Sequence, residues 1–358
     1  MLHSLQGIVD HPCYELYNIL EVIFREAANG SPFSRGLFPE RIRTRWTRIG
    51  NLPQDMEDIY IEIVALPVAD RENIYQQFLN NNLIQDLCED ATTPFIDNIE
   101  WEEPFGNHLA MFVKGCYKKL DLSIFRRIGC SKKPTKRFYE DFIQINKLVC
   151  PFCGMQTYKN PRNVRREDFD HYLNKVRYPL AAANMMNLVP MCTECNQGYK
   201  KEKNVIFDGA NRILAYYPYS GVAGVEIVTH CTTYPTLDDV GEWSVQLIPN
   251  DVAETAKINN WDRIFRVSER MANEIIEYYQ EWMDDSLERN RPNDFEDLDQ
   301  FREFFRQQAL DAATSADRKM EPRAHLKKAF FSFIADEAEE VFAESFLVSY
   351  RAQLALAA

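Results

Sequence analysis

The sequence has no apolar run that approaches the roughly 18 residues needed to span a membrane, and its mean hydropathy is −0.40. The N-terminal residues also lack the basic region and apolar core of a signal peptide. The sequence shows no internal repeat and no low-complexity linker. We therefore expect a protein of roughly two or three domains that makes no membrane contact and is located in the cytoplasm.

An excess of positive charge, the usual mark of a nucleic-acid-binding protein, is missing from the chain as a whole. Its 41 Lys and Arg are outnumbered by 54 Asp and Glu, and the net charge is −13. Residues 111–205 reverse this balance, with 19 Lys and Arg against 8 Asp and Glu. Charge runs are usually solvated faces, but the local contrast predicts a phosphate-facing surface. The acidic remainder can limit loose binding of nucleic acid or serve as a surface for a partner.

Two cysteine pairs are the most informative feature that is present. The first is Cys150 and Cys153 in Cys-Pro-Phe-Cys, and the second is Cys192 and Cys195 in Cys-Thr-Glu-Cys. Four thiolates at this spacing can close a tetrahedral zinc site. We predict a structural zinc, since a short segment buries too little apolar surface to hold a rigid site. The other cysteines lack short-range partners and are expected to be buried small residues in a reducing compartment: Cys13, Cys88, Cys116, Cys130 and Cys231.

Polar residues suited to acid–base catalysis and to binding a divalent cation lie between the two cysteine pairs and directly after the second pair. Asp170 and His171 are adjacent, Asn187 follows, and Asn196 comes directly after the last cysteine. Histidine suits a general base because its ordinary pKa of about 6.5 leaves it mostly neutral at neutral pH. Asp170 and Asn196 offer oxygen ligands for a hard divalent cation. Asn187 can accept a hydrogen bond from one ring nitrogen of His171 and so select its tautomer.

Residues 150–204 resemble the HNH endonucleases of the ββα-metal class. The resemblance rests on the two cysteine pairs, Asp170-His171, residues 187–191, Asn196 and the basic tail of Lys200, Lys201 and Lys203, which occur in the order typical of that family. It implies two strands and a helix held by a zinc knuckle, with His171 as general base. It further implies that Asp170 and Asn196 hold one Mg²⁺ or Mn²⁺ and that Asn187 orients His171. Neighbouring residues of a regular strand point to opposite faces, so both can serve one site only if the backbone leaves strand geometry there. The resemblance implies that Asp170-His171 lies at such a strand end.

The sequence departs from the family pattern at two places. A proline is frequent three or four residues after the histidine, but the proline of this chain comes later, at Pro179. The lysine that is usual three residues after the last asparagine is replaced by Tyr199, with Lys200 one step further on.

The expected fold is α+β and mostly helical. Apolar residues recur at helical spacing in residues 16–24, 74–87, 264–282 and 326–342, whereas residues 225–229 and 243–248 read as strands. Residues 59–68 are compatible with a strand or a buried helix turn. We divide the chain into an N-terminal helical region (1–105), a basic helical approach segment (106–149), the zinc and ββα-metal unit (150–207), a β-rich segment (208–250) and a C-terminal helical region (251–358).

These expectations point to a metal-dependent endonuclease that hydrolyses phosphodiester bonds of DNA, with RNA not excluded. The layout resembles that of bacterial restriction and anti-phage defence effectors. A zinc-stabilised nucleic-acid-binding or scaffold protein without catalysis is the alternative, as is a nuclease that is silent until activated. The activator would be a partner protein such as an ATPase or sensor, and assembly into a homo-oligomer is a further alternative. The expected nucleic-acid contacts are Lys132, Lys133, Lys136, Arg137, Lys175, Arg177, Lys200, Lys201 and Lys203.

Overall fold

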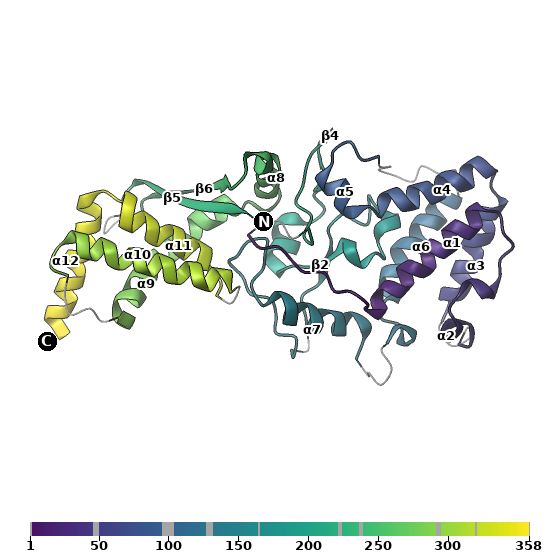
Figure 1. Cartoon of the computed structure of the whole chain (residues 1–358), viewed down its shortest axis with the longest axis horizontal. Helices are drawn as coiled ribbons and strands as arrows, with labels where there is room; N and C mark the ends of the chain where they lie inside the picture. Colours follow the sequence, from purple (N-terminus) through teal and green to yellow (C-terminus); the bar gives the residue numbers. More distant parts are fainter. Residues whose placement is uncertain are drawn as a thin grey trace. The chain divides into compact units, whose positions relative to one another are not determined.

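The computed structural model describes residues 2–45, 50–94, 104–126, 132–163, 165–220, 224–235, 239–290, 295–318 and 321–357. Helices predominate in these residues, and the strands form small antiparallel sheets (Figure 1). This composition agrees with the expected α+β, mostly helical class. The chain divides into two compact units, here called the N-terminal unit (Ser4–Asn146 and Lys159–Val222) and the C-terminal unit (Met1–His3, Lys147–Tyr158 and Ala223–Ala358).

The N-terminal unit begins with a helical layer in which α1 packs against α3 and α4 (Figure 1). The apolar stripe Leu16–Phe24 is buried on α1, which confirms the helix expected there. The helices and short 3₁₀ turns of this layer are η1 (Pro12–Tyr14), α1 (Glu15–Ala28), η2 (Arg35–Leu37), α2 (Glu40–Arg43), α3 (Leu52–Ala65), α4 (Val68–Asn81), α5 (Ile84–Glu89), α6 (Phe105–Lys119), η4 (Ser123–Phe125) and α7 (Pro134–Asn146).

Two segments of this layer need comment against the secondary structure expected from the sequence. Within the ambiguous residues 59–68, residues 59–65 are helical, since Met56, Ile59 and Ile63 recur at helical spacing on the buried face of α3, and Leu66 and Pro67 separate α3 from α4. The helix expected over residues 74–87 is divided into α4 and α5. The Asn82 side chain donates to the carbonyl of Phe78 at 2.8 Å, a local bond that favours the end of a helix.

The second part of the N-terminal unit holds the short strands and turns of residues 159–222. Strand β1 (Phe169–His171) pairs antiparallel with β2 (Leu188–Pro190), so that His171 lies opposite Leu188. The connection between them, residues 172–187, is called the β1–β2 loop. A π-helical segment, η7 (Glu194–Lys200), follows β2. The remaining elements are η5 (Pro179–Ala181), η6 (Met185–Asn187), β3 (Phe207–Asp208) and β4 (Asn211–Arg212).

The C-terminal unit combines a two-stranded ribbon with helices. The expected strands are confirmed as β5 (Val225–Thr233) and β6 (Glu242–Pro249), and Trp243 of β6 packs against Tyr279, Phe330 and Phe333. The helical pattern from residue 264 is interrupted at Arg266, which adopts a left-handed conformation with φ 49°. The helical segments are η8 (Val252–Glu254), α8 (Thr255–Phe265), α9 (Val267–Asn290), α10 (Leu298–Asp317), α11 (Ala324–Ser332), η9 (Phe333–Glu337) and α12 (Glu340–Ala357).

None of the helices in the described part of the chain has the length and apolar character that crossing a membrane requires.

Candidate metal centre and catalytic pocket

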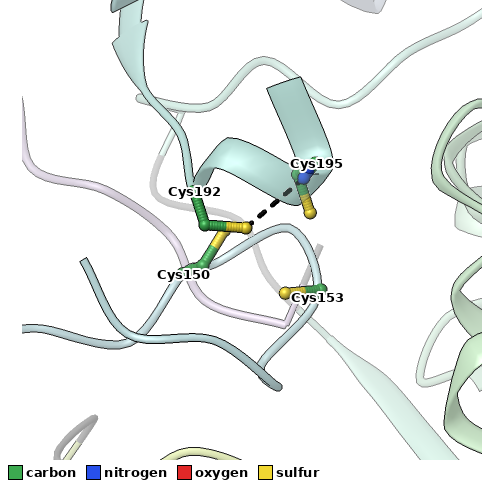
Figure 2. A group of neighbouring side chains, drawn as sticks. All are labelled: Cys150, Cys153, Cys192 and Cys195. Carbon is green, nitrogen blue, oxygen red and sulfur yellow. Dashed lines mark hydrogen bonds between the residues drawn. The ribbon is translucent and has the colours of Figure 1, made fainter. Parts of the chain in front are cut away.

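The four predicted zinc ligands converge on one point. The sulfur atoms of Cys150, Cys153, Cys192 and Cys195 all lie within 4.8 Å of one another, and each side chain is buried. Figure 2 shows the sulfurs of Cys150 and Cys153 facing those of Cys192 and Cys195. Tetrahedral zinc with Zn–S distances of about 2.3 Å places sulfurs about 3.8 Å apart, so the cluster has a suitable size. These residues, called the cysteine cluster below, can hold a metal such as zinc.

The backbone around each pair supports thiolate ligands. The N–H of Cys195 donates to Sγ of Cys192 at 3.4 Å, and the N–H of Met155 donates to Sγ of Cys153 at 3.4 Å (Figure 2 draws the first). Hydrogen bonds of this kind stabilise a charged sulfur. The first turn closes through Gly154, whose φ is +67° and whose missing Cβ would lie 2.5 Å from Leu2. Glycine is therefore needed at this position for both conformation and space.

The cysteines outside the cluster were expected to be buried small residues. Cys13, Cys88 and Cys116 are buried, whereas Cys231 is only half-buried and Cys130 lies outside the described residues. Burial raises the pKa of the Cys116 thiol to about 12, so this side chain stays protonated at neutral pH.

Three of the four predicted catalytic residues line one pocket, and the fourth, Asn187, does not. Asp170, His171 and Asn196 all contribute to a hollow of about 380 Å³, together with Tyr117 and Lys175. Asp170 and His171 come from the last two residues of β1, and Asn196 comes from η7. The strand ends at His171, as the expectation for adjacent Asp and His requires. The structure therefore brings together the proposed base and both proposed oxygen ligands.

His171 is held as a neutral imidazole. Its side chain is buried, and its Nε2 atom lies 3.1 Å from the carbonyl oxygen of Ala182. A carbonyl can only accept, so Nε2 carries the proton and Nδ1 has a lone pair. Burial lowers the pKa of His171 to about 3, and the ammonium groups of Lys175 and Lys200 act in the same direction. The Tyr117 ring packs edge-on against the imidazole at a centroid distance of 4.6 Å.

Asn187 does not bond to His171, so the direct contact expected from the sequence is wrong. Its Oδ1 accepts from the N–H of Leu173 at 2.7 Å, and its Nδ2 donates to the carbonyls of Leu173 and Ala181 at 3.0 and 3.2 Å. All these partners belong to the β1–β2 loop. Asn187 thus fixes the loop that presents the carbonyl of Ala182 to His171, and its effect on the imidazole is indirect.

Lys200 occupies a position that the sequence did not predict. Its side chain is fully buried, with Nζ 2.8 Å from Oδ2 of Asp170 and 3.0 Å from the backbone oxygen of His171. The expected contact between Lys200 and a nucleic-acid backbone is therefore wrong, because a buried ammonium cannot reach a strand at the surface. Burial raises the pKa of the Asp170 carboxyl, and the ammonium groups of Lys200 and Lys175 oppose that shift.

The other basic residues fall into two groups. Near the pocket, Lys175 and Lys201 line the wall and Lys203 is exposed, while Arg177 lies over the Phe207 ring at 5.5 Å. Upstream, the cations are mostly paired with acids beside or within α7. Lys132 lies 2.7 Å from Glu140, Lys133 lies 3.9 Å from Asp121 and Arg137 lies 2.8 Å from Asp141, while Lys136 is half-buried on the same helix.

No family model matches the sequence, and no solved structure matches it. The chain is similar to protein ea31 of Escherichia phage lambda. The two are 33% identical over 101 residues, which is 28% of this chain and 31% of that protein. The chain therefore matches about a third of the length of this relative, and the similarity is partial.

Two residues that contact the His171 side chain carry no signal in the sequence. Tyr117 belongs to α6, more than fifty positions before His171, and sits in a run that reads simply as basic. Ala182 acts through its backbone oxygen, so no side-chain type marks it. Both become visible only when the β1–β2 loop and α6 are placed around the imidazole.

A larger hollow of about 970 Å³ lies elsewhere in the N-terminal unit, against η1, α1 and α5. It shares no lining residue with the pocket of His171. Several of its polar groups bond one another: Asn184 donates to Asn82 at 3.0 Å, and Arg41 pairs with Glu15. The larger hollow also contains an imidazole and carboxylates, but only the smaller pocket is lined by Asp170, His171 and Asn196, the residues singled out in the sequence.

Proposed function

We propose that the protein is a metal-dependent endonuclease of the HNH type that hydrolyses phosphodiester bonds of DNA. The observation that carries the proposal is the meeting of Asp170, His171 and Asn196 in one pocket. Asn196 belongs to the same short helical segment as Cys195 of the cysteine cluster. A structural zinc at that cluster would anchor the segment that presents Asn196.

His171 is the proposed general base. Its Nε2 is engaged by the carbonyl of Ala182, which leaves Nδ1 to take the proton of an attacking water. The lowered pKa keeps this nitrogen unprotonated across the neutral range. Because this imidazole is weakly basic, it would accept the proton of the water while the water attacks the phosphate, and not in an earlier separate step.

The donor set suits a hard divalent cation. Asp170 offers a buried carboxylate, whose Oδ2 lies 2.8 Å from the ammonium of Lys200, and Asn196 offers an amide oxygen. These two residues would hold Mg²⁺ or Mn²⁺, and the remaining positions would be filled by water and by the substrate phosphate. When bound, the cation would polarise the phosphate and stabilise the leaving 3′ oxygen, which gives 5′-phosphate ends. Lys175 and Lys201 on the pocket wall would attract the phosphates of the strand.

The experiment is incubation of supercoiled plasmid with the purified protein and Mg²⁺ or Mn²⁺. Nicking or linearisation is expected for the wild-type protein and not for His171→Ala. Asp170→Ala and Asn196→Ala should raise the metal concentration needed for half-maximal cleavage. Binding of DNA without cleavage by any variant or metal would contradict the proposal and favour a zinc-stabilised binding protein.

The alternative to this self-sufficient enzyme is a nuclease under the control of a partner, as in a restriction or anti-phage effector. Such a nuclease would be silent alone and would cut once an ATPase or sensor is added. The plasmid assay repeated with the product of a neighbouring gene separates this case from a protein without catalysis, because only the controlled nuclease regains cleavage that depends on His171.

A further inference from the structure

An internal cation neutralises the carboxylate of the proposed metal site. Lys200 is fully buried and Asp170 is 7% exposed, and their charged atoms are 2.8 Å apart. The Lys200 ammonium is also anchored by the backbone oxygen of His171 at 3.0 Å. A surface lysine could swing away at little cost, but this one is held between two residues of the site itself.

The charges around the pocket balance without a metal ion. Its wall includes the carboxylates of Asp168, Asp170 and Glu202 and the ammonium groups of Lys175 and Lys201. Lys200 does not line the wall but contacts Asp170. Asp168 and Glu202 are exposed, so water screens their charges. The buried pair has no net charge. A divalent cation entering this site gains one carboxylate and meets a fixed positive charge beside it.

We propose that Lys200 is an internal counter-cation that makes divalent-metal binding depend on bound nucleic acid. This inference rests on the proposed nuclease function. Lys200 cancels the negative charge of Asp170, and a phosphate of the bound strand restores a negative charge beside the metal position. Metal and nucleic acid therefore bind cooperatively, and the free protein has little affinity for the ion. Lys200 is a positioning residue in this scheme, because it acts through Asp170 and does not touch the reacting atoms.

The test measures Mn²⁺ binding by electron paramagnetic resonance, which does not require cleavage. All proteins carry His171→Ala, so that added double-stranded DNA stays intact. The parent should bind Mn²⁺ weakly alone and at least about tenfold more tightly with DNA, because a nearby unit charge in a partly buried site shifts divalent-ion affinity by this much or more. Lys200→Gln should raise the affinity of the free protein and reduce the effect of DNA by a similar factor.

Two further variants serve as controls. Lys118→Met removes one charge from an exposed position on α6 outside the pocket wall and should leave Mn²⁺ affinity unchanged. Lys200→Arg keeps the positive charge and should preserve weak binding alone and strong coupling. It also covers the case in which Lys200→Gln fails to fold, because loss of coupling in a folded Lys200→Arg protein would overturn the inference.

The outcomes separate this inference from the nuclease itself. Tight Mn²⁺ binding by the DNA-free parent, unchanged in Lys200→Gln, would overturn the role of Lys200 while cleavage by the wild-type protein still supports the nuclease. Absence of Mn²⁺ binding even with DNA would overturn both. Coupling that persists in full in Lys200→Gln would assign it to other groups of the pocket and would also overturn the inference.

Discussion

The Nε2 atom of His171 lies 3.1 Å from the backbone oxygen of Ala182, eleven residues further along the chain. This contact assigns the proton to Nε2 and leaves Nδ1 with the lone pair, which the proposed mechanism uses to accept a proton. Because the acceptor is a backbone atom, the tautomer depends on the conformation of the β1–β2 loop. The structure of the loop is thus part of the proposed catalytic apparatus, although most of its residues do not line the pocket.

The central prediction concerns His171. Replacement by alanine should lower the cleavage rate roughly 100- to 10,000-fold, the usual cost of losing a general base. DNA binding and thermal stability should change little, which gel-shift and melting measurements can check. Cleavage by His171→Ala at the wild-type rate would remove this residue from the mechanism.

Asn187→Ala should destabilise the N-terminal unit as well as slow cleavage. The side chain is fully buried and satisfies one N–H and two carbonyl groups of the β1–β2 loop. Leaving them unpaired should lower the free energy of unfolding by at least about 2 kcal/mol, measured by denaturant titration. A slower rate without any change in stability would instead indicate a direct catalytic role.

The cysteine cluster predicts one tightly bound zinc per chain. Elemental analysis after dialysis should find it, and Cys153→Ser should lose the metal and about 3 kcal/mol or more of stability. Cys231→Ser is the matched control, since Cys231 lies outside the cluster. Folded wild-type protein without zinc would refute this prediction.

The pKa of His171 predicts a dependence of stability on pH. Its folded value is about 3 because of burial, whereas the unfolded chain has the ordinary value of 6.5. Between these values the unfolded state binds one proton more than the folded state, so stability falls as the pH is lowered. His171→Gln should reduce this slope by up to about 1.4 kcal/mol per pH unit. Denaturant titrations of both proteins between pH 7 and pH 4 give the difference, and parallel curves would contradict the assigned shift.

Nucleic-acid affinity should reside in the basic residues near the pocket. Neutralising Lys175, Lys201 and Lys203 together should weaken binding to all sequences and reduce the slope of log K against log salt by about 0.9 for each phosphate that is no longer neutralised. Neutralising Lys132, Lys133 and Arg137 should have a smaller effect, because these cations already lie near carboxylates. An equal decrease in affinity from the two sets would show that the upstream ion pairs open to receive the strand.

The sequence by itself determined the features that depend on local spacing. Cysteines three residues apart can face one ion, so the cluster could be predicted from its ligands alone. The apolar stripe of α1 and the alternation in β5 and β6 follow from the periods of helix and strand. The grouping of Asp170, His171 and Asn196 was expected from a family resemblance, and its geometry is consistent with that expectation.

Only the tertiary structure decided which hydrogen-bond and ion-pair partners the polar side chains have. Lys200 and Lys201 are neighbours of the same type, yet one is fully buried against Asp170 and the other is exposed on the pocket wall. Asn187 was expected to reach His171, but it bonds the β1–β2 loop because its amide can satisfy several backbone groups there. Spacing in the sequence specifies neither choice, since burial and hydrogen bonding depend on segments that meet only when the chain folds.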